Sequence, residues 1–309
     1  MFEDANCTHA PAKTPSNAGI AGTGVLLSFI ITAVLALLIS VSLIIQDSFF
    51  KSSKPSTIRR KLLNSYSDQQ ILTGIGIQAV GLAQLDTLVP YHFFIIWMLS
   101  LLSMAVHNAT LLALVGEFKR DWVLRWLRQF LMFVNLILSA IYGIFMLQVV
   151  QKDIETSTLP VACVWGIDGN GSASNAGLSY VGTIAVIAGN CIVFAASTWY
   201  LHYRKQRFFK LAQLIGWVLM TAIAVGATVR VILLSQAFGK PTTPLSDKGE
   251  TVWSFGSLIS LLMLLLPLMS LLEIARGEVQ IAPPVMDDKE PLLDTEMAPY
   301  QPNPFFRKK

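Results

Sequence analysis

The 309-residue sequence is unusually apolar: hydrophobic residues make up 53%, charged residues make up 14%, and the mean hydropathy is +0.57. Soluble domains carry about 25% charged residues, so this composition excludes a soluble enzyme, a collagen, a disordered protein and a disulfide-rich secreted module. The stretch 21–45 contains no charge, and an uncharged apolar run of about 18 residues or more is typical of a membrane-spanning helix. The apolar runs are continuous rather than alternating, which disfavours a membrane β-barrel.

The apolar runs predict an all-α fold, a seven-transmembrane-helix bundle. Each run is about as long as a hydrocarbon core of ~30 Å requires. The expected spans, in chain order, are 20–45, 71–88, 91–115, 129–151, 178–201, 211–236 and 252–273. The chain thus divides into an N-terminal segment (1–19), a transmembrane domain (20–273) and a disordered cytoplasmic tail (274–309).

Lys and Arg are distributed unequally between the two sides of this bundle. Of the 23 basic residues, 18 lie in the loops after the first, third and fifth spans or in the tail, four lie on the opposite side, and Arg230 alone lies within a span. Lys and Arg concentrate in the cytoplasmic loops of membrane proteins. This asymmetry predicts an N-terminus outside and a C-terminus in the cytoplasm, which requires an odd number of spans.

The outer side of this topology is expected to carry two kinds of modification. Asn6 and Asn170 stand in Asn-X-Ser/Thr sequons and are predicted to be N-glycosylated, with Asn170 lying nearer the membrane. Cys7 and Cys163 lie on the same oxidising side, where their thiols can form a disulfide. Three cysteines in the whole chain are too few for a disulfide scaffold.

The tail contains a short sequence typical of sorting signals. Asp288, Leu292 and Leu293 match an acidic dileucine signal, a type that cytoplasmic sorting adaptors read for endosomal or vacuolar delivery. The alternative is a plain disordered tail without such a role. We therefore expect a protein of the plasma membrane or of an endosomal or vacuolar membrane, whose partners are the lipid bilayer and sorting adaptors.

Polar residues recur at helical spacing in the second and third spans. Four residues of the third span follow one another at intervals of three or four, which places them on one helix face: Ser100, Ser103, His107 and Thr110. A short turn at Pro90 makes the two spans an antiparallel hairpin, so Gln78 is expected at the depth of His107. We predict a hydrogen bond between these two side chains.

Two interpretations of this polar face remain open. Small and hydroxyl residues commonly hold membrane helices together, so the face can serve packing alone. Alternatively, Gln78, His107 and Asn108 form a site for a ligand or an ion, because polar residues inside a membrane face the bundle interior and are often functional.

Two charged residues lie well inside the expected spans. Asp86 and Arg230 are each near the outer end of a span, and Arg readily extends its charge to the membrane surface. The alternative is an Asp86–Arg230 ion pair that lines an outward-facing cavity.

The segment before the second span has a helix-start signal. Ser67 stands three residues before Gln70, as in a capping box, where each side chain bonds the backbone N–H of the other residue. Asp68 between them suits the positive end of a helix dipole. The pattern predicts a helix that begins at Ser67.

A larger set of residues surrounds this signal, over about 60–130. It comprises Ser67-Asp68-Gln69-Gln70, Thr73-Gly74, Gly81, Gln84-Leu85, Tyr91-His92, Trp97, Ser103, His107, Thr110-Leu111 and Arg125–Arg128. The set resembles the motifs of an uncharacterised family of multi-pass membrane proteins from ascomycete fungi, from which Asn108-Ala109 departs. The resemblance implies a seven-helix layout and a fungal source, and it implies no activity.

Named classes of membrane protein can be tested against particular residues. A retinal-binding rhodopsin needs a Schiff-base Lys in the seventh span, and 252–273 contains none. A membrane terpene cyclase needs acidic residues that face a cavity, for which Asp86 is the sole candidate. The inverted repeats found in many transporters are not evident.

We therefore predict a receptor-like or sensing protein with an unknown small-molecule ligand. A small-solute transporter or channel is the alternative, and a membrane-bound enzyme such as a terpene cyclase comes third. A continuous polar path from Asp86 and Arg230 to Gln78 and His107 would favour transport. No catalytic residue, cofactor, metal site or nucleic-acid partner is expected.

Overall fold

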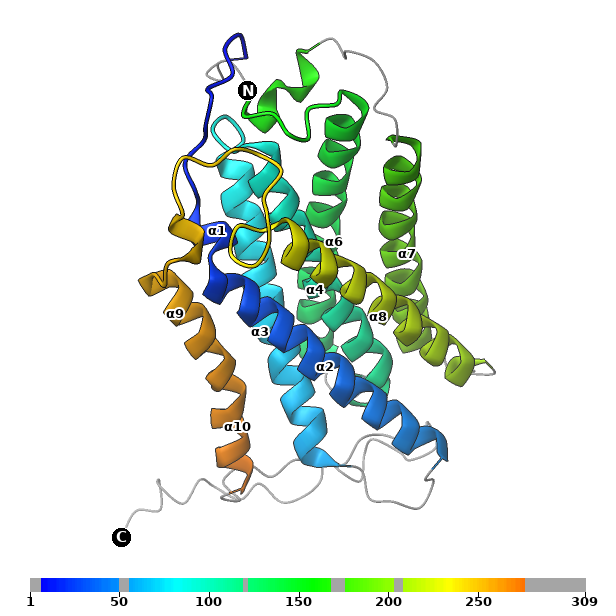
Figure 1. Cartoon of the computed structure of the whole chain (residues 1–309). Coiled ribbons are helices and arrows are strands. Elements are labelled where there is room, and N and C mark those ends of the chain that lie inside the picture. The colour runs from blue at the N-terminus through cyan, green and yellow to red at the C-terminus, as the bar shows by residue number, and fades with distance from the viewer. Residues whose placement is uncertain (1–6, 50–55, 119–121, 168–175, 203–207, 276–309) are drawn as a thin grey trace.

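The protein folds as an all-helical bundle (Figure 1). The structure, a computed structural model, describes residues 7–49, 56–118, 122–167, 176–202 and 208–275. Within these ranges no strand is formed, and the sole β-type pairing is an isolated parallel bridge between Thr14 and Leu245.

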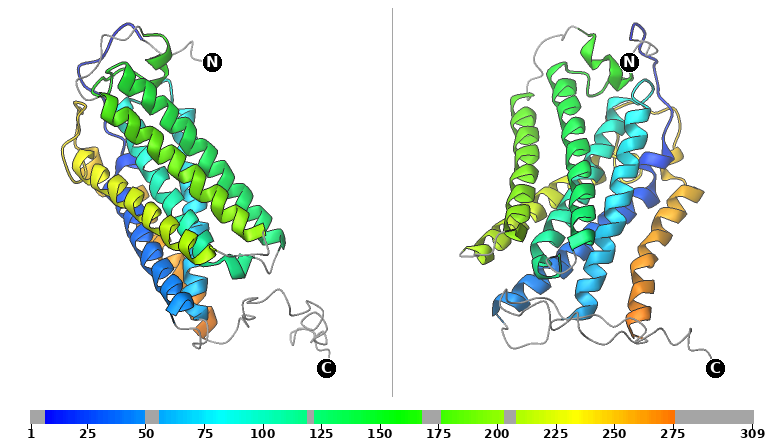
Figure 2. Two further views of the ribbon diagram at one scale, coloured as in Figure 1. Left: turned by 90° about the vertical axis from the view of Figure 1, so that its right-hand side faces the viewer. Right: turned by 180° about the vertical axis from the view of Figure 1, so that it is seen from behind.

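The helices follow the expected spans closely, with one exception. They are α1 (Ala18–Ala21), α2 (Thr23–Phe49), α3 (Thr57–Ala83), α4 (Pro90–Ala113), α5 (Val115–Phe118), α6 (Trp122–Gln151), η1 (Val161–Trp165), α7 (Ala176–His202), α8 (Phe209–Leu234), η2 (Gly249–Thr251), α9 (Phe255–Leu262), η3 (Met263–Leu265) and α10 (Leu266–Ala275). The bundle has two ends: we call the one with the N-terminal segment and η1 the disulfide end, and the opposite one, where α3 begins, the basic end (Figures 1 and 2).

Six helical segments of the described chain are long and apolar enough to cross a membrane. They are Ala18–Asp47, Pro90–Ala113, Arg125–Gln151, Tyr180–His202, Phe209–Leu234 and Gly249–Met269. Large apolar side chains are exposed on the outside of the bundle, among them Phe130, Ile192, Trp199, Leu233 and Leu262. Water-soluble monomers rarely expose so much apolar surface, whereas a hydrocarbon solvent accommodates it.

The exception is the second expected span, and the prediction of its bounds was wrong. The helix does not run over 71–88: α3 begins at Thr57 and ends at Ala83, and Gln84 is its C-cap. Its first half carries charged residues, so α3 as a whole is less apolar than the six segments above. It nevertheless packs inside the bundle, against α2, α4, α6 and α10.

The capping-box interpretation of Ser67 was also wrong. Ser67 lies buried in the interior of α3, and the N-cap of that helix is Ser56. Asp68, one residue on, accepts two hydrogen bonds from Arg128, from Nε at 2.8 Å and from Nη2 at 2.6 Å. The polar cluster therefore joins α3 to α6 rather than starting a helix.

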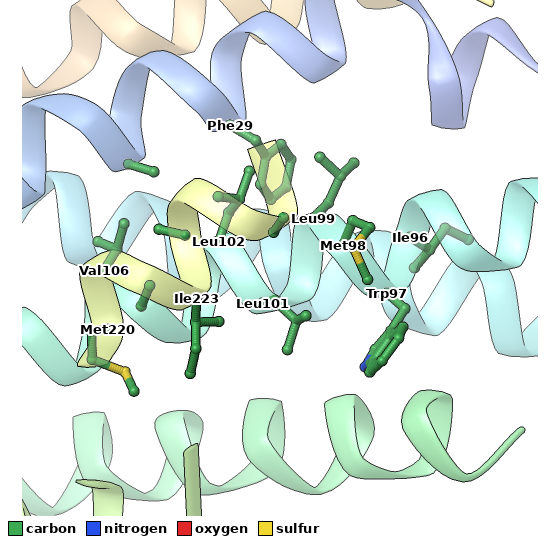
Figure 3. Packing of buried hydrophobic residues seen from close by; sticks show 14 of the residues in the cluster. Phe29, Ile96, Trp97, Met98, Leu99, Leu101, Leu102, Val106, Met220 and Ile223 are labelled. Carbon is green, nitrogen blue, oxygen red and sulfur yellow. The ribbon is translucent and has the colours of Figure 1, made fainter. Parts of the chain in front are cut away.

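Helix α4 occupies the centre of the bundle. It packs against α2, α3, α6, α7 and α8, and 23 of its 24 residues are buried. A helix that is apolar on all sides is typically a buried one, and α4 contains no Asp, Glu, Lys or Arg. Figure 3 shows its side chains packing in opposite directions: Phe29 of α2 lies on one side of α4, and Trp97 extends toward the other.

Two local features shape the last helical segment. Gly24 lets α9 approach α2 closely, since a methyl group there would lie 2.2 Å from the carbonyl oxygen of Ser257. The segment then changes to the 3₁₀ turn η3 before α10. Pro267 explains this interruption, because proline has no N–H to donate to the carbonyl of residue 263 and its ring crowds that group.

Candidate functional site

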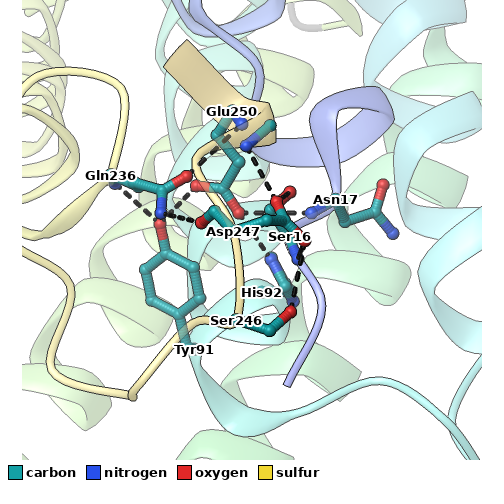
Figure 4. A network of polar contacts seen from close by, with 9 residues as sticks. Ser16, Asn17, Tyr91, His92, Gln236, Ser246, Asp247 and Glu250 are labelled. Carbon is teal, nitrogen blue, oxygen red and sulfur yellow. Dashed lines mark hydrogen bonds and ion pairs between the residues drawn. The ribbon is translucent and has the colours of Figure 1, made fainter. Parts of the chain in front are cut away.

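The disulfide end holds a buried polar network around Glu250 (Figure 4). The Glu250 carboxylate lies 2.7 Å from His92 Nε2 and accepts a hydrogen bond from the Tyr91 hydroxyl at 2.7 Å. The backbone N–H of Asn17 donates to the same carboxylate at 3.3 Å. The Tyr91 oxygen in turn accepts from the backbone N–H of Gln236 at 2.9 Å. We call these five residues the Glu250 network.

The Glu250 network connects segments that are far apart in the chain. Tyr91 and His92 lie in the first turn of α4, Asn17 is the N-cap of α1, and Glu250 lies in η2. Glu250 is fully buried and His92 is 3% exposed. Their contact is an ion pair when the imidazole is protonated and otherwise a hydrogen bond from Nε2–H. An acidic side chain beside the first turn of α4 also suits the positive end of that helix.

Further contacts fasten the N-terminal segment over the same end. Cys7 and Cys163, the pair considered in the sequence, are joined by a disulfide with an S–S distance of 1.99 Å. Ser16 donates its hydroxyl to Asp247. This hydroxyl, followed by the backbone N–H of Gly249, holds the pKa of the Asp247 carboxyl below its usual value of 3.8. The ionised Asp247 side chain therefore links the N-terminal segment to the loop that precedes η2.

A second polar network lies at mid-depth, between α3, α4 and α6, and we call it the Asn135 network. Gln78 Nε2 donates to Asn135 Oδ1 at 2.5 Å, and Asn135 Nδ2 donates to Ser103 Oγ at 3.3 Å. His107 Nε2 lies 2.9 Å from Ser103 Oγ, and His107 Nδ1 lies 3.4 Å from Ser67 Oγ. The predicted Gln78–His107 hydrogen bond is not formed. Asn135 and Ser103 stand between the two side chains.

The rest of the predicted polar face serves packing. Ser100 Oγ lies 2.9 Å from Ser139 Oγ of α6, and Thr110 bonds the carbonyl of Val106 within α4. Asn108 Nδ2 contacts Met220 Sδ at 3.3 Å, and its Oδ1 is buried without a hydrogen-bond partner in the described part of the chain. The structure thus brings Gln78 and His107 into one network and leaves Asn108 outside it.

Arg230 lies in an apolar cleft between α7 and α8. These helices lie close together near the basic end and diverge toward the disulfide end (Figures 1 and 2). Two adjoining cavities of about 220 and 290 Å³ occupy the cleft and share three lining residues, Trp97, Thr183 and Arg230. Trp97 is 2% exposed, and its indole N–H has no hydrogen-bond partner among the described residues.

The acidic neighbour of Arg230 is Glu155 rather than Asp86. Glu155 lines the same cavity as Arg230, and among the described residues no ion pair joins Asp86 to Arg230. Burial raises the pKa of the Glu155 carboxyl above 4.5; Asp153 adds to the rise, and Arg230 partly offsets it. Asp86 lies in the turn after α3, and its Oδ1 is buried without a hydrogen-bond partner in the part of the chain that the structure describes.

Several predicted sites lie outside the described residues. They are the sequons at Asn6 and Asn170 and the tail motif of Asp288, Leu292 and Leu293. Within the described ranges, no group of three or more His, Cys, Asp or Glu side chains is arranged to hold a metal ion.

Reasoning from the sequence missed Glu250, Glu155 and Asn135 as members of these sites. Glu250 and Glu155 lie in or beside connecting segments, which have no periodicity that would assign them a partner. Asn135 offered a detectable signal, because it is an uncharged polar residue inside an apolar span and is spaced four residues from Ser139.

No family model matches the sequence, and comparisons with curated proteins and with solved structures find no match. The resemblance to a fungal membrane-protein family therefore stays a prediction.

Proposed function

We propose that this multi-pass membrane protein is receptor-like and binds a small amphipathic anion in the cleft between α7 and α8. The observation that carries the proposal is the composition of this cleft. Arg230 offers a cation, the buried Trp97 ring forms part of the inner wall, and apart from Glu155 the remaining walls are largely apolar. Small-molecule sites are typically apolar cavities with a few well-placed polar groups.

The separation of the cleft from the Asn135 network favours a receptor over a transporter. A transport path would have to connect Arg230 with Gln78 and His107. The two sites share no residue, and Gln78, His107 and Asn135 are all fully buried. A ligand in the cleft would contact α4, α6, α7 and α8, so its binding energy can favour one arrangement of these helices over another.

An outer location of the disulfide end is part of this proposal. Structural disulfides persist in oxidising compartments, and Cys7–Cys163 lies at this end. The excess of basic residues assigned to the opposite side supports the same orientation. The proposal places the protein at the plasma membrane or at an endosomal or vacuolar membrane, and a reporter fused to its C-terminus should face the cytoplasm.

The test measures thermal unfolding of the purified protein in detergent with a panel of amphipathic carboxylic acids and their methyl esters. We expect acids to raise the Tm and esters to have little effect, because only acids offer a charge to Arg230. Arg230→Gln should abolish the shift, and Lys240→Gln, an exposed basic residue outside the cleft, should retain it. Equal shifts from acids and esters, or an undiminished shift in Arg230→Gln, would contradict the proposal.

A second variant tests the cleft by its shape. Nothing lies within 4 Å of a methyl group built on Gly226, which lines the cleft, or on Gly76, which lies on α3 outside it. Gly226→Leu should fill the cleft and remove the acid-dependent shift, while Gly76→Leu should keep it.

Accumulation of a bound acid inside proteoliposomes would instead support the transporter alternative.

The pKa of Glu155 predicts how binding depends on pH. Below its raised pKa the Glu155 carboxyl is neutral and does not attract Arg230, which is then available to an anionic ligand. As the pH rises through that pKa, the Glu155 carboxylate competes with the ligand for Arg230. An acid that remains ionised throughout should therefore bind more tightly at the lower pH. Glu155→Gln should remove this dependence.

A further inference from the structure

A groove on another side of the bundle lies between α2, α3 and α9. Its cavity is about 460 Å³, within the range of about 300–1,000 Å³ typical of small-molecule sites. Figure 1 shows α9 and α10 running beside α3, with α2 crossing near them. The groove is separate from the cleft around Arg230, and the two share no lining residue.

The groove is uncharged but contains polar groups without partners. None of its lining residues is Asp, Glu, Lys, Arg or His. Within the described residues, Gln69 Oε1 and Gln70 Oε1 are buried and have no hydrogen-bond partner, and Gln70 is 2% exposed. Leaving a buried polar group unpaired is costly, so these amides favour a ligand that brings a hydrogen-bonding group to the middle of α3.

The groove is elongated and polar at both ends. Its lining on α3 runs from Gln69 to Gln84, about 22 Å at 1.5 Å per residue. The stretch between contains Gly76, Ile77 and Val80, and the groove's three hydroxyl residues (Ser28, Thr73 and Ser260) each bond a carbonyl of their own helix. Gln84 and Asn17 lie at the end nearer the loops. The Asn17 side chain points away from the Glu250 network in Figure 4. An uncharged, elongated molecule with a polar group at each end matches this distribution.

We propose that the groove binds a sterol that carries a second hydroxyl at the end of its side chain. The side-chain hydroxyl lies at the Gln69 and Gln70 amides, and the ring hydroxyl lies near Gln84 and Asn17. A hydroxyl both donates and accepts, so it pairs with an amide in either orientation. Ceramide, whose polar groups lie at one end of the molecule, cannot supply both ends of the groove at once. A rigid ring system also loses less conformational freedom on binding than an acyl chain does.

The experiment compares two radiolabelled probes that differ in one hydroxyl: cholesterol and cholesterol hydroxylated at the end of its side chain. Saturable binding is measured on the full chain in detergent. We expect the wild type to bind the hydroxylated sterol about tenfold more tightly, the order of one buried hydrogen bond. Gln70→Leu should bring the two affinities together and should unfold at the same or a higher temperature without sterol, because it removes an unpaired group.

Matched glycine variants locate the site. Gly76→Leu fills open space in the groove and should weaken binding of both sterols, with its folding checked by thermal unfolding. Gly226→Leu should bind both as the wild type does, and it also separates this site from the proposed anion cleft. Equal wild-type affinities for the two sterols, a preference that survives in Gln70→Leu, or equal displacement by ceramide would each overturn the proposal.

Discussion

The Glu250 network and the Asn135 network differ in charge, depth and origin. The first contains a carboxylate and an imidazole, lies at the disulfide end, and draws residues from a loop, a 3₁₀ turn and two helix starts. The second consists of amide, hydroxyl and imidazole groups, lies at mid-depth, and draws only on residues inside α3, α4 and α6. In both networks, the described side chains are buried or partly buried.

This difference follows from where backbone donors are available. In the middle of a helix every backbone N–H is already paired, so a buried acceptor there depends on side-chain donors, although a side-chain donor can still use a backbone carbonyl, as Gln78 uses that of Gly74. Neutral groups also cost less to bury than charges. At helix starts and in loops, unpaired N–H groups are present. Glu250 accepts one from Asn17, and Tyr91 accepts one from Gln236. A buried carboxylate is therefore feasible at the disulfide end and would be far more costly beside Asn135.

The largest expected effect comes from breaking the buried pair. Glu250→Leu should lower the free energy of unfolding by about 3–5 kcal/mol, because it leaves His92 and Tyr91 without their shared acceptor. Glu250→Gln, which keeps an acceptor oxygen, should lose less. Thermal or denaturant unfolding in detergent measures both. Lys248→Gln is the control, since Lys248 is exposed in the same loop, and its Tm should change little. An unchanged stability in Glu250→Leu would mean that the network contributes nothing.

The next effect tests the close packing that the Asn135 network requires. A methyl group on Gly74 would lie 2.4 Å from Ser103 Oγ, whereas one on Gly76 meets nothing within 4 Å. Gly74→Ala should therefore destabilise by about 1–3 kcal/mol through overpacking. Gly76→Ala should be neutral or stabilising, because alanine favours a helix over glycine. Equal Tm values for the two variants would show that α3 shifts freely against α4.

A double-mutant cycle measures the contacts inside the Asn135 network. The coupling between Gln78→Leu and Asn135→Leu should lie near 0.6 kcal/mol and below about 1.7 kcal/mol, the range of interhelical hydrogen bonds in membranes. Gln78→Leu with His107→Leu should couple more weakly, because these side chains meet only through Asn135 and Ser103. The reverse order would restore the direct Gln78–His107 pair that the sequence suggested.

The smallest effect comes from a charged pair that is only partly buried. Asp68 and Arg128 are 41% and 20% exposed in their side chains and form two hydrogen bonds. Asp68→Asn should cost less than about 1 kcal/mol, since exposed ion pairs contribute little, and the loss should shrink further in high salt. A loss as large as that of Glu250→Leu would mean that burial does not decide how much a charged pair contributes to the stability of this protein.

The sequence by itself determined the helical bundle and most of its long helices. Uncharged apolar runs the length of a hydrocarbon core have few alternatives to a membrane helix, so six of the seven expected spans match helical segments to within a few residues. Periodicity also placed Gln78, Ser103 and His107 on facing surfaces of α3 and α4. The start of α3 was misjudged for two reasons. The first half of the helix is charged and has no continuous apolar run, and Ser67 with Gln70 matches the sequence pattern of a capping box.

The partners of the polar residues were decided only by the tertiary structure. Helical spacing predicts which face a side chain lies on but not which residue of a third helix reaches it, so Asn135 replaced the expected direct contact. Glu250 reaches His92 across 158 positions of the chain, through a loop whose path no periodic pattern specifies. Likewise, Arg230 lines a cavity with Glu155 instead of pairing with Asp86, because the segment after α6 brings Glu155 to the cavity that α8 lines, an arrangement that no single helix specifies.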